Sequence, residues 1–216
     1  YYVIDKSRGS PVVKRVFGNI FTGILICDFW GAYNKLCALA KQRCFYHLFT
    51  ELLKVDKCNS SNAWKRFRKK LSRLLKDAIR LSERKGRLNP QDFQRRKQRL
   101  YARLHQFLET PGDDKDAKRL IKRLNRHRGE LFTFLEYHGV SPYNNHGEQQ
   151  MRKPAINRKV SQQNRSDRGA KTQAILMTLF RSAELKKLNP VETVLALAKE
   201  CIDPNTSVEN EFRLVA

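Results

Sequence analysis

A run of apolar residues at helical spacing, from Asn62 to about Gly86, constrains the fold of this chain more than any other feature. In "NAWKRFRKKLSRLLKDAIRLSERKG" apolar side chains recur every three or four positions, and most of the other positions are Lys or Arg. This period puts the apolar side chains on one face of an α-helix. The segment therefore predicts a long, basic amphipathic helix that ends near Gly86.

More helices are predicted further along the chain. Asn89 can cap a helix whose first turn holds Pro90. The sequence "TPGDDKD" breaks that helix, and a third helix is predicted from about Ala117 to Tyr137. Two closing helices are predicted, one through "AILMTLFRSAEL" and one that starts at "NPVE".

The first part of the chain has a different pattern. The runs "YYVI", "PVVKRVF" and "FTGILIC" are rich in β-branched and aromatic residues and alternate with Gly and Ser, so they predict short strands. Next, "GAYNKLCALAKQ" has apolar residues at helical spacing, and "CFYHLFTELLKV" fits a strand followed by a helix. Strands followed by a block of helices predict an α/β fold with a helical region.

The charge of the chain indicates its partner. There are 44 Lys and Arg against 21 Asp and Glu, which gives a formal charge of +23. Such an excess favours a polyanionic partner, and we expect nucleic acid. No apolar run reaches the length of a membrane span, so a membrane is not expected. Five scattered cysteines form no disulfide framework and favour a reducing cytoplasm.

Two acids stand out as candidates for chemistry. Asp28 ends the most apolar strand candidate, where a carboxylate is held rigidly and can bind a metal. The alternative is that Asp28 only caps the following helix. Glu148 follows "YNNHG", and if Asn145 is the helix cap, Glu148 falls at the third helical position and completes a capping box. The sequence around each acid leaves both alternatives open.

Other polar residues are candidates for supporting roles. Cys44 and His47 have half of a zinc-like spacing, but no second half follows, so core packing or a polar tether is favoured over a complete zinc site. Arg152, Arg158 and Lys159 lie in a polar, basic stretch that suits phosphate contacts, and a solvated loop is the alternative. No P-loop or dinucleotide fingerprint is present, which disfavours nucleotide-dependent chemistry.

The order of these motifs resembles a known family. "GILICDFWGAY", "CFYHLF", the basic helices, "YNNHGEQQMRKPAINRK" and "GAKTQAILMTLFRSAELKKLNPVETV" together resemble the C-terminal catalytic region of the IS66 family of bacterial insertion-sequence transposases, which are of the DDE type. The resemblance implies an RNase H-like α/β core interrupted by a basic, all-helical insertion. Residues 1–50 would form the first part of the core, residues 51–140 the insertion, and residues 141–216 the last part.

The resemblance also assigns roles to residues. Asp28 would be the second and Glu148 the third metal-binding acid, holding Mg²⁺ or Mn²⁺ for DNA strand cleavage and transfer. Structural support of the site would come from Cys44, His47, Asn144 and Asn145. The DNA contacts would come from Arg152, Arg158, Lys159, Arg165 and Arg168.

The same resemblance sets expectations for the whole protein. The family's first Asp lies upstream of the strands that begin this chain, so we expect an N-terminally truncated fragment that is inactive by itself. Gly147 and Gln149 stand where the family usually has Ala and Arg. The partners would be transposon ends and target DNA, bound by a homo-oligomer at the nucleoid of a bacterial cytoplasm.

Two alternatives to a transposase fit the same residues. In the first, the chain is a non-catalytic nucleic-acid-binding module whose basic helices make all the contacts. In the second, the helices from Trp64 to Tyr137 form a scaffold for a partner protein, and the charge is incidental.

Overall fold

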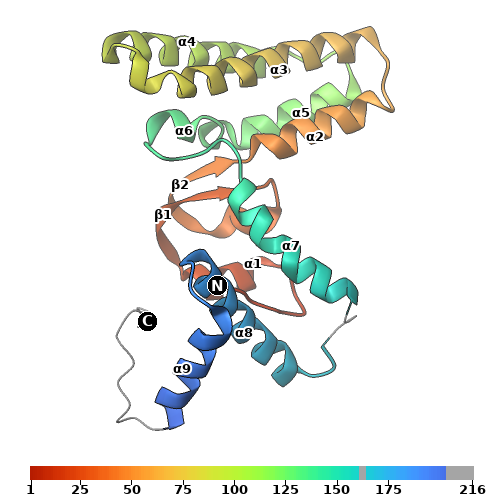
Figure 1. Ribbon diagram of the computed structural model, residues 1–216. Helices are drawn as coiled ribbons and strands as arrows, with labels where there is room; N and C mark the ends of the chain where they lie inside the picture. The colour runs from red at the N-terminus through yellow and green to blue at the C-terminus, as the bar shows by residue number, and fades with distance from the viewer. Residues whose placement is uncertain (161–163, 203–216) are drawn as a thin grey trace. The chain divides into compact units, whose positions relative to one another are not determined.

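The chain is described by a computed structural model that covers residues 1–160 and 164–202. It forms two compact units. The larger unit is Gly9–Glu148, and the smaller unit combines Tyr1–Arg8 with Gln149–Ala216. The described residues are mostly helical with one small sheet, a mixed α/β composition (Figure 1).

The larger unit contains both strands and most of the helices. Its elements, in chain order, are α1 (Ser10–Phe17), β1 (Ile20–Cys27), η1 (Gly31–Lys35), β2 (Cys37–Arg43), α2 (Phe45–Asp56), α3 (Asn62–Glu83), η2 (Lys85–Arg87), α4 (Pro90–Glu109), α5 (Lys115–Arg126), η3 (Arg128–Glu130) and α6 (Thr133–Glu136). Helix α7 (Asn145–Val160) begins in the larger unit and continues into the smaller one, which also contains α8 (Asp167–Leu185) and α9 (Pro190–Ile202).

The two strands pair in parallel. Cys27 of β1 lies opposite Arg43 of β2, and the register shifts between Phe21 and Ile24. A side chain at Gly23 would lie only 2.6 Å from the ring of Phe21, so the ring would have to move to make room for it in this irregular part of the strand. Because the strands are parallel, the residues that follow both of them lie at the same edge of the sheet.

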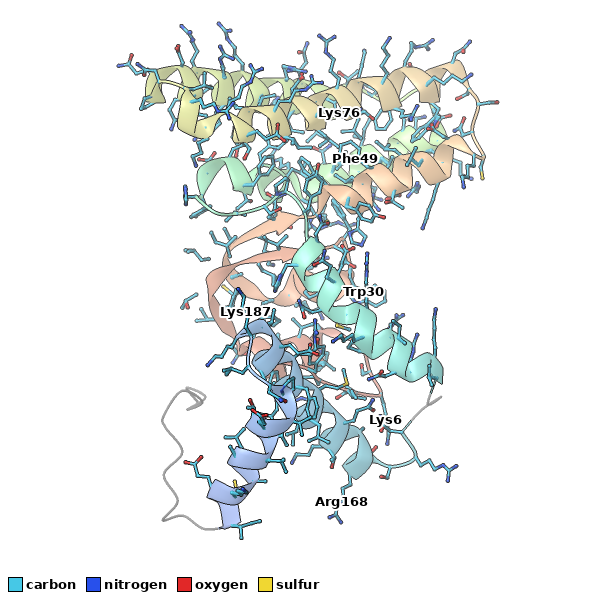
Figure 2. All side chains as sticks on the ribbon, viewed as in Figure 1. Lys6, Trp30, Phe49, Lys76, Arg168 and Lys187 are labelled. Atoms are coloured by element: carbon cyan, nitrogen blue, oxygen red, sulfur yellow. The ribbon has the colours of Figure 1, made fainter. Side chains whose placement is uncertain are left out.

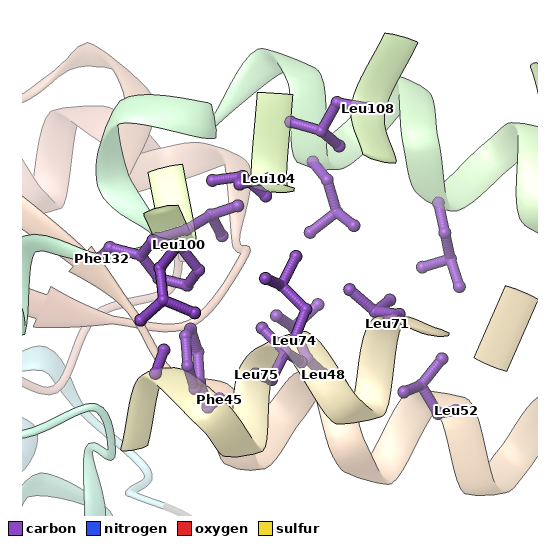
Figure 3. Packing of buried hydrophobic residues seen from close by; sticks show 14 of the residues in the cluster. Phe45, Leu48, Leu52, Leu71, Leu74, Leu75, Leu100, Leu104, Leu108 and Phe132 are labelled. Carbon is purple, nitrogen blue, oxygen red and sulfur yellow. The ribbon is translucent and has the colours of Figure 1, made fainter. Parts of the chain in front are cut away.

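Helices α2 to α6 enclose the main core. Helix α3 contacts α2, α4, α5 and α6, and its apolar stripe is buried as the spacing predicts. The indole N–H of Trp64, which is fully buried, donates to Asp56 Oδ1 at 2.8 Å. Figure 3 shows how leucines from α2, α3 and α4 meet Phe45 and Phe132 in this cluster. The long basic helix is therefore the centre of a helical layer.

Several predicted elements are confirmed. The helix that follows Ser61, the helix capped by Asn89 and the two closing helices all form, and the Asn89 side chain accepts the N–H of Gln91 at 2.9 Å. The strand through "FTGILIC" is confirmed as β1.

Two of the strands predicted in the first part of the chain were wrong. "PVVKRVF" is helical because Val13 and Phe17, one turn apart, pack on the cluster around Leu25. "YYVI" is not a strand, since Tyr2 bonds instead to Thr178 Oγ1 and to the carbonyl of Gln150 in its own unit. In both cases tertiary contacts override the β propensity of the residues.

The other wrong predictions come from the spacing of apolar residues, which was read as helical. "CALAKQ" was assigned to a helix but forms β2, in which Leu39 is exposed while its neighbour Ala38 packs on the sheet cluster. The third long helix is interrupted after Arg126, because the five consecutive residues 131–135 are all buried. One face of a continuous helix cannot bury five consecutive side chains.

No helix in the described ranges has both the length and the apolar character that crossing a membrane requires.

Candidate metal centre

The sheet places Asp28 and Cys44 at one edge. Asp28 directly follows β1 and Cys44 directly follows β2, and the N–H of Cys44 donates to the carbonyl of Cys27 at 2.8 Å. Parallel neighbouring strands lie about 4.8 Å apart, so the backbones of Asp28 and Cys44 are neighbours. The carboxyl edge of a parallel sheet is where ligands bind in open α/β folds.

Asp28 forms a turn rather than a helix cap. Its Oδ1 accepts the N–H of Trp30 at 2.9 Å, whereas Trp30 is itself the cap residue of η1 and that cap has no side-chain bond. One carboxylate oxygen of Asp28 is thus used locally, and the carboxylate is only partly buried. Its charge, after the larger effect of burial, raises the pKa of the Tyr33 phenol.

The fully buried Arg43 fixes the backbone at Asp28. Its guanidinium donates to the Asp28 carbonyl at 2.7 Å, to Asn34 Oδ1 at 2.8 Å and to Glu130 Oε2 at 2.5 Å. Glu130 is also contacted by His127 Nδ1 at 3.0 Å. Five donors in a rigid plane allow one arginine to hold three acceptors. Sequence reasoning missed Arg43, and no local signal in the sequence marks this arginine as buried.

Glu148 is not part of a capping box. Helix α7 begins at Asn145, and the N–H of Glu148 donates to the Asn144 carbonyl at 3.0 Å. Asn144 is therefore the cap residue, and Glu148 is the fourth helical residue, one position beyond the place that a capping box requires. The cap expected at Asn145 is displaced by one residue, which leaves the Glu148 carboxylate free for other contacts.

The Glu148 carboxylate lies against Cys44 and His47. Its Oε1 is 4.0 Å from Cys44 Sγ and 3.6 Å from His47 Nδ1, and one ligand atom from each of the three residues lies within 4.8 Å of the others. Cys44 is the cap residue of α2, and His47 lies in the first turn of that helix. The structure thus brings together three of the residues predicted for the site, and Asp28 stands at the same sheet edge.

Two backbone bonds hold the helix start of α7 in place. The N–H of Asn144 donates to Cys44 Sγ at 3.2 Å, and the N–H of Phe45 donates to the Pro142 carbonyl at 2.8 Å. A side chain at Gly147 would lie 2.8 Å from Asn144 Oδ1, so glycine lets the cap side chain approach the helix closely. Asn144 therefore supports the position of Glu148. For Asn145 the structure shows its place as the first residue of α7.

The predicted DNA-contacting residues belong to the smaller unit. Arg152, Arg158 and Lys159 are exposed on α7, Arg165 is exposed just before α8, and Arg168 is exposed in its first turn. Lys153, between them, pairs with Glu184 Oε1 at 2.7 Å. The five predicted residues keep their charges at the surface.

A second basic surface lies in the larger unit. Figure 2 shows nitrogen-tipped side chains along α3 and α4. Between these two helices is a groove of ≈ 380 Å³ that is lined by Arg80, Arg84, Arg96, Arg99 and Arg103 together with Asp77, Leu81 and Leu100. Asp77 pairs with Arg80 and Arg103, whereas the exposed side chains of Arg84, Arg96 and Arg99 make no ion pair within the described residues. Helical spacing alone did not single out these arginines.

Comparison with known proteins gives one match. A family model described as "Transposase IS66 family" matches residues 1–172. No curated protein and no solved structure matches the chain.

Proposed function

Because this chain belongs to the IS66 family of transposases, we propose that it cuts and joins DNA strands by the metal-dependent chemistry of DDE transposases, with Asp28 and Glu148 as two of the three acids. One observation carries the proposal: Asp28 and Cys44 follow paired parallel strands, and the Glu148 carboxylate lies against Cys44. This arrangement supports a shared site at one sheet edge for two acids that lie 120 positions apart in sequence.

The fold supports a division of the chain into a catalytic core and an insertion. We propose that the parallel pair β1–β2 belongs to an RNase H-like core, and that residues 51–140 are the helical insertion between its second and third acids. The helices of that region bury a large apolar cluster, to which Phe45 and Leu48 of the preceding part of the chain also contribute. A helical insertion can be accommodated between two parts of a catalytic domain.

The donor atoms of Asp28 and Glu148 suit the metal that the family implies. Both are carboxylates, and oxygen ligands are those that Mg²⁺ and Mn²⁺ prefer. When bound, such ions activate a water or a 3′-hydroxyl and stabilise the leaving oxygen of an in-line phosphodiester displacement. Arg43 holds the backbone at Asp28, and Asn144 fixes the start of the helix that carries Glu148. These two residues would position the acids without touching DNA.

The exposed cations of the smaller unit would bind the DNA backbone. Arg152, Arg158, Lys159, Arg165 and Arg168 can neutralise phosphates, which supplies affinity without sequence selection. Joining two transposon ends would require more than one copy of the protein, so we propose a homo-oligomer on DNA.

Nicking of supercoiled plasmid DNA tests the proposed activity. The resemblance places the first acid upstream of Tyr1, so the assay uses the chain together with that upstream segment. We expect nicked circles with Mg²⁺ or Mn²⁺ and none with EDTA. DNA binding without nicking under any of these ions would instead support a non-catalytic binding module.

The arginine-lined groove between α3 and α4 favours a second function of the larger unit, which is the binding of duplex DNA by these two helices. Phosphate contacts release condensed counterions, so each lost contact lowers the steepness of the salt dependence by about 0.9 in a plot of log affinity against log salt. The double variant Arg96→Gln/Arg99→Gln is therefore expected to lower this slope by about 2. Fluorescence anisotropy with a labelled duplex at several salt concentrations measures it.

The matched control removes the same amount of charge, from one position on α3 and one on α4. Arg68 pairs with Asp56 at 2.7 Å and Arg95 pairs with Asp92 at 2.6 Å, so both are already neutralised within the protein. The double variant Arg68→Gln/Arg95→Gln should leave the slope nearly unchanged. Equal slopes for the two double variants would show that the groove makes no phosphate contacts.

A further inference from the structure

We propose that Cys44, His47 and Glu148 form a binding site for a borderline-soft divalent cation, with Zn²⁺ as the best-fitting ion. The three residues offer one thiolate, one imidazole and one carboxylate, and their ligand atoms lie within 4.8 Å of one another. This donor set is typical of zinc and unsuited to Mg²⁺, which takes oxygen ligands. The site shares Glu148 with the pair of acids proposed for catalysis, and its other donors are Cys44 and His47.

The distances are close to those of a filled site. Zinc lies about 2.3 Å from sulfur and about 2.0–2.2 Å from nitrogen or oxygen, so tetrahedral ligands lie about 3.3–3.6 Å apart. Here Glu148 Oε1 is 3.6 Å from His47 Nδ1 and 4.0 Å from Cys44 Sγ. Cys44 and His47 offer ligand atoms within 4.8 Å of each other, and a contraction of a few tenths of an ångström would bring Glu148 Oε1 to coordinating distance from both. The side chain of Glu148 can supply it, because this side chain is 38% exposed.

The imidazole of His47 has a ring nitrogen without a hydrogen-bond partner, and a cation could bind to it. Its Nδ1 atom is buried and has no hydrogen-bond partner in the described structure, although a carboxylate oxygen lies 3.6 Å away. That separation is too long for a hydrogen bond. A buried polar atom without a partner costs free energy and calls for an explanation. A cation between Nδ1 and Oε1 would satisfy both atoms.

The surroundings of Cys44 favour its role as a ligand. The thiol is fully buried, and its Sγ accepts the N–H of Asn144 at 3.2 Å. Such a bond stabilises the negative charge of a metal-bound thiolate and fixes the direction of the sulfur. Cys44 is the cysteine at this edge that is placed to bind a metal.

The site has an open side. His47 and Glu148 are partly exposed, so an ion can enter from solvent, and three protein ligands leave the fourth tetrahedral position for water. A bound Zn²⁺ would also occupy the Glu148 carboxylate. On the proposed function, this would withhold the third acid from Mg²⁺ and slow DNA cleavage. The cation site itself does not depend on that activity.

Cobalt absorption tests the site without any DNA. Co²⁺ replaces Zn²⁺ in tetrahedral sites, and a bound thiolate gives it a charge-transfer band in the near ultraviolet. We expect the whole chain to bind Co²⁺ with this band and with the visible bands of a tetrahedral ion, and Zn²⁺ to displace it. His47→Asn and Glu148→Gln should each weaken Zn²⁺ binding at least tenfold, as losses of metal-site groups do.

Cysteine variants identify the sulfur ligand. Cys44→Ser should abolish the charge-transfer band, whereas Cys58→Ser, which changes an exposed cysteine, should keep it. Circular dichroism checks that each variant is folded, and His47→Asn provides an independent readout at a partly exposed position. A wild-type chain without the band in excess Co²⁺ would overturn the proposal. So would a band that persists in folded Cys44→Ser, or unchanged Zn²⁺ affinity in His47→Asn.

Discussion

Glu148→Gln is expected to lower metal-dependent DNA nicking by about a thousandfold or more, and Asp28→Asn should do the same. Each change replaces a carboxylate ligand with a neutral amide of the same shape. Metal-ion catalysis stabilises the transition state by several kcal/mol, and about 4 kcal/mol corresponds to a thousandfold in rate. The two losses should not add, because either one disables the same centre. Plasmid nicking rates in Mn²⁺ measure the effect.

The control for this prediction is a carboxylate outside the site. Glu109 is exposed at the end of α4, and only His105 pairs with it within the described residues. Glu109→Gln should nick at the wild-type rate, and all three variants should bind DNA as the parent does. Wild-type nicking by either Asp28→Asn or Glu148→Gln would remove that residue from the catalytic centre.

Arg43→Met is expected to destabilise the larger unit by about 3 kcal/mol, since removing one member of a buried ionic network leaves its partners unsatisfied. Arg43 is fully buried and holds Glu130, Asn34 and the Asp28 carbonyl. Methionine preserves much of the side-chain volume of arginine, so the loss of stability measures the polar contacts of Arg43. Urea unfolding followed by tryptophan fluorescence measures the effect, because Trp64 lies in the core of this unit.

Arg119→Met is the matched change at the surface. Arg119 also pairs with a carboxylate, at 2.5 Å from Glu51 Oε1, but its side chain is 50% exposed. Exposed ion pairs contribute about 1 kcal/mol or less. Equal losses of stability in the two variants would mean that Arg43 is not the buried anchor of the Asp28 turn.

The helical part of the fold was predictable because its signals are local. The stripe from Trp64 to Leu81 and the cap at Asn89 each specify a helix from neighbouring residues alone. The first fifty residues were harder, because their elements are decided by distant partners. "PVVKRVF" has strand-forming residues, yet its packing on the cluster around Leu25 makes it a helix.

The candidate site was predictable only through the ordered motifs. Local reasoning left Asp28 and Glu148 as possible caps, and nothing in the spacing placed Glu148 next to Cys44 and His47. Their meeting depends on contacts about a hundred residues apart, such as the bond from Asn144 to Cys44. Arg43 escaped notice because burial of a charge cannot be read from one sequence.

The central claim is that Asp28 and Glu148 share a catalytic metal site. Its most direct test is a crystal structure of the protein bound to a transposon-end duplex in Mn²⁺, with the ion located by anomalous scattering. We expect a manganese peak within about 2.5 Å of a carboxylate oxygen of each residue, the coordination distance of such ions. A manganese ion bound elsewhere, with these carboxylates too far apart to share it, would contradict the claim.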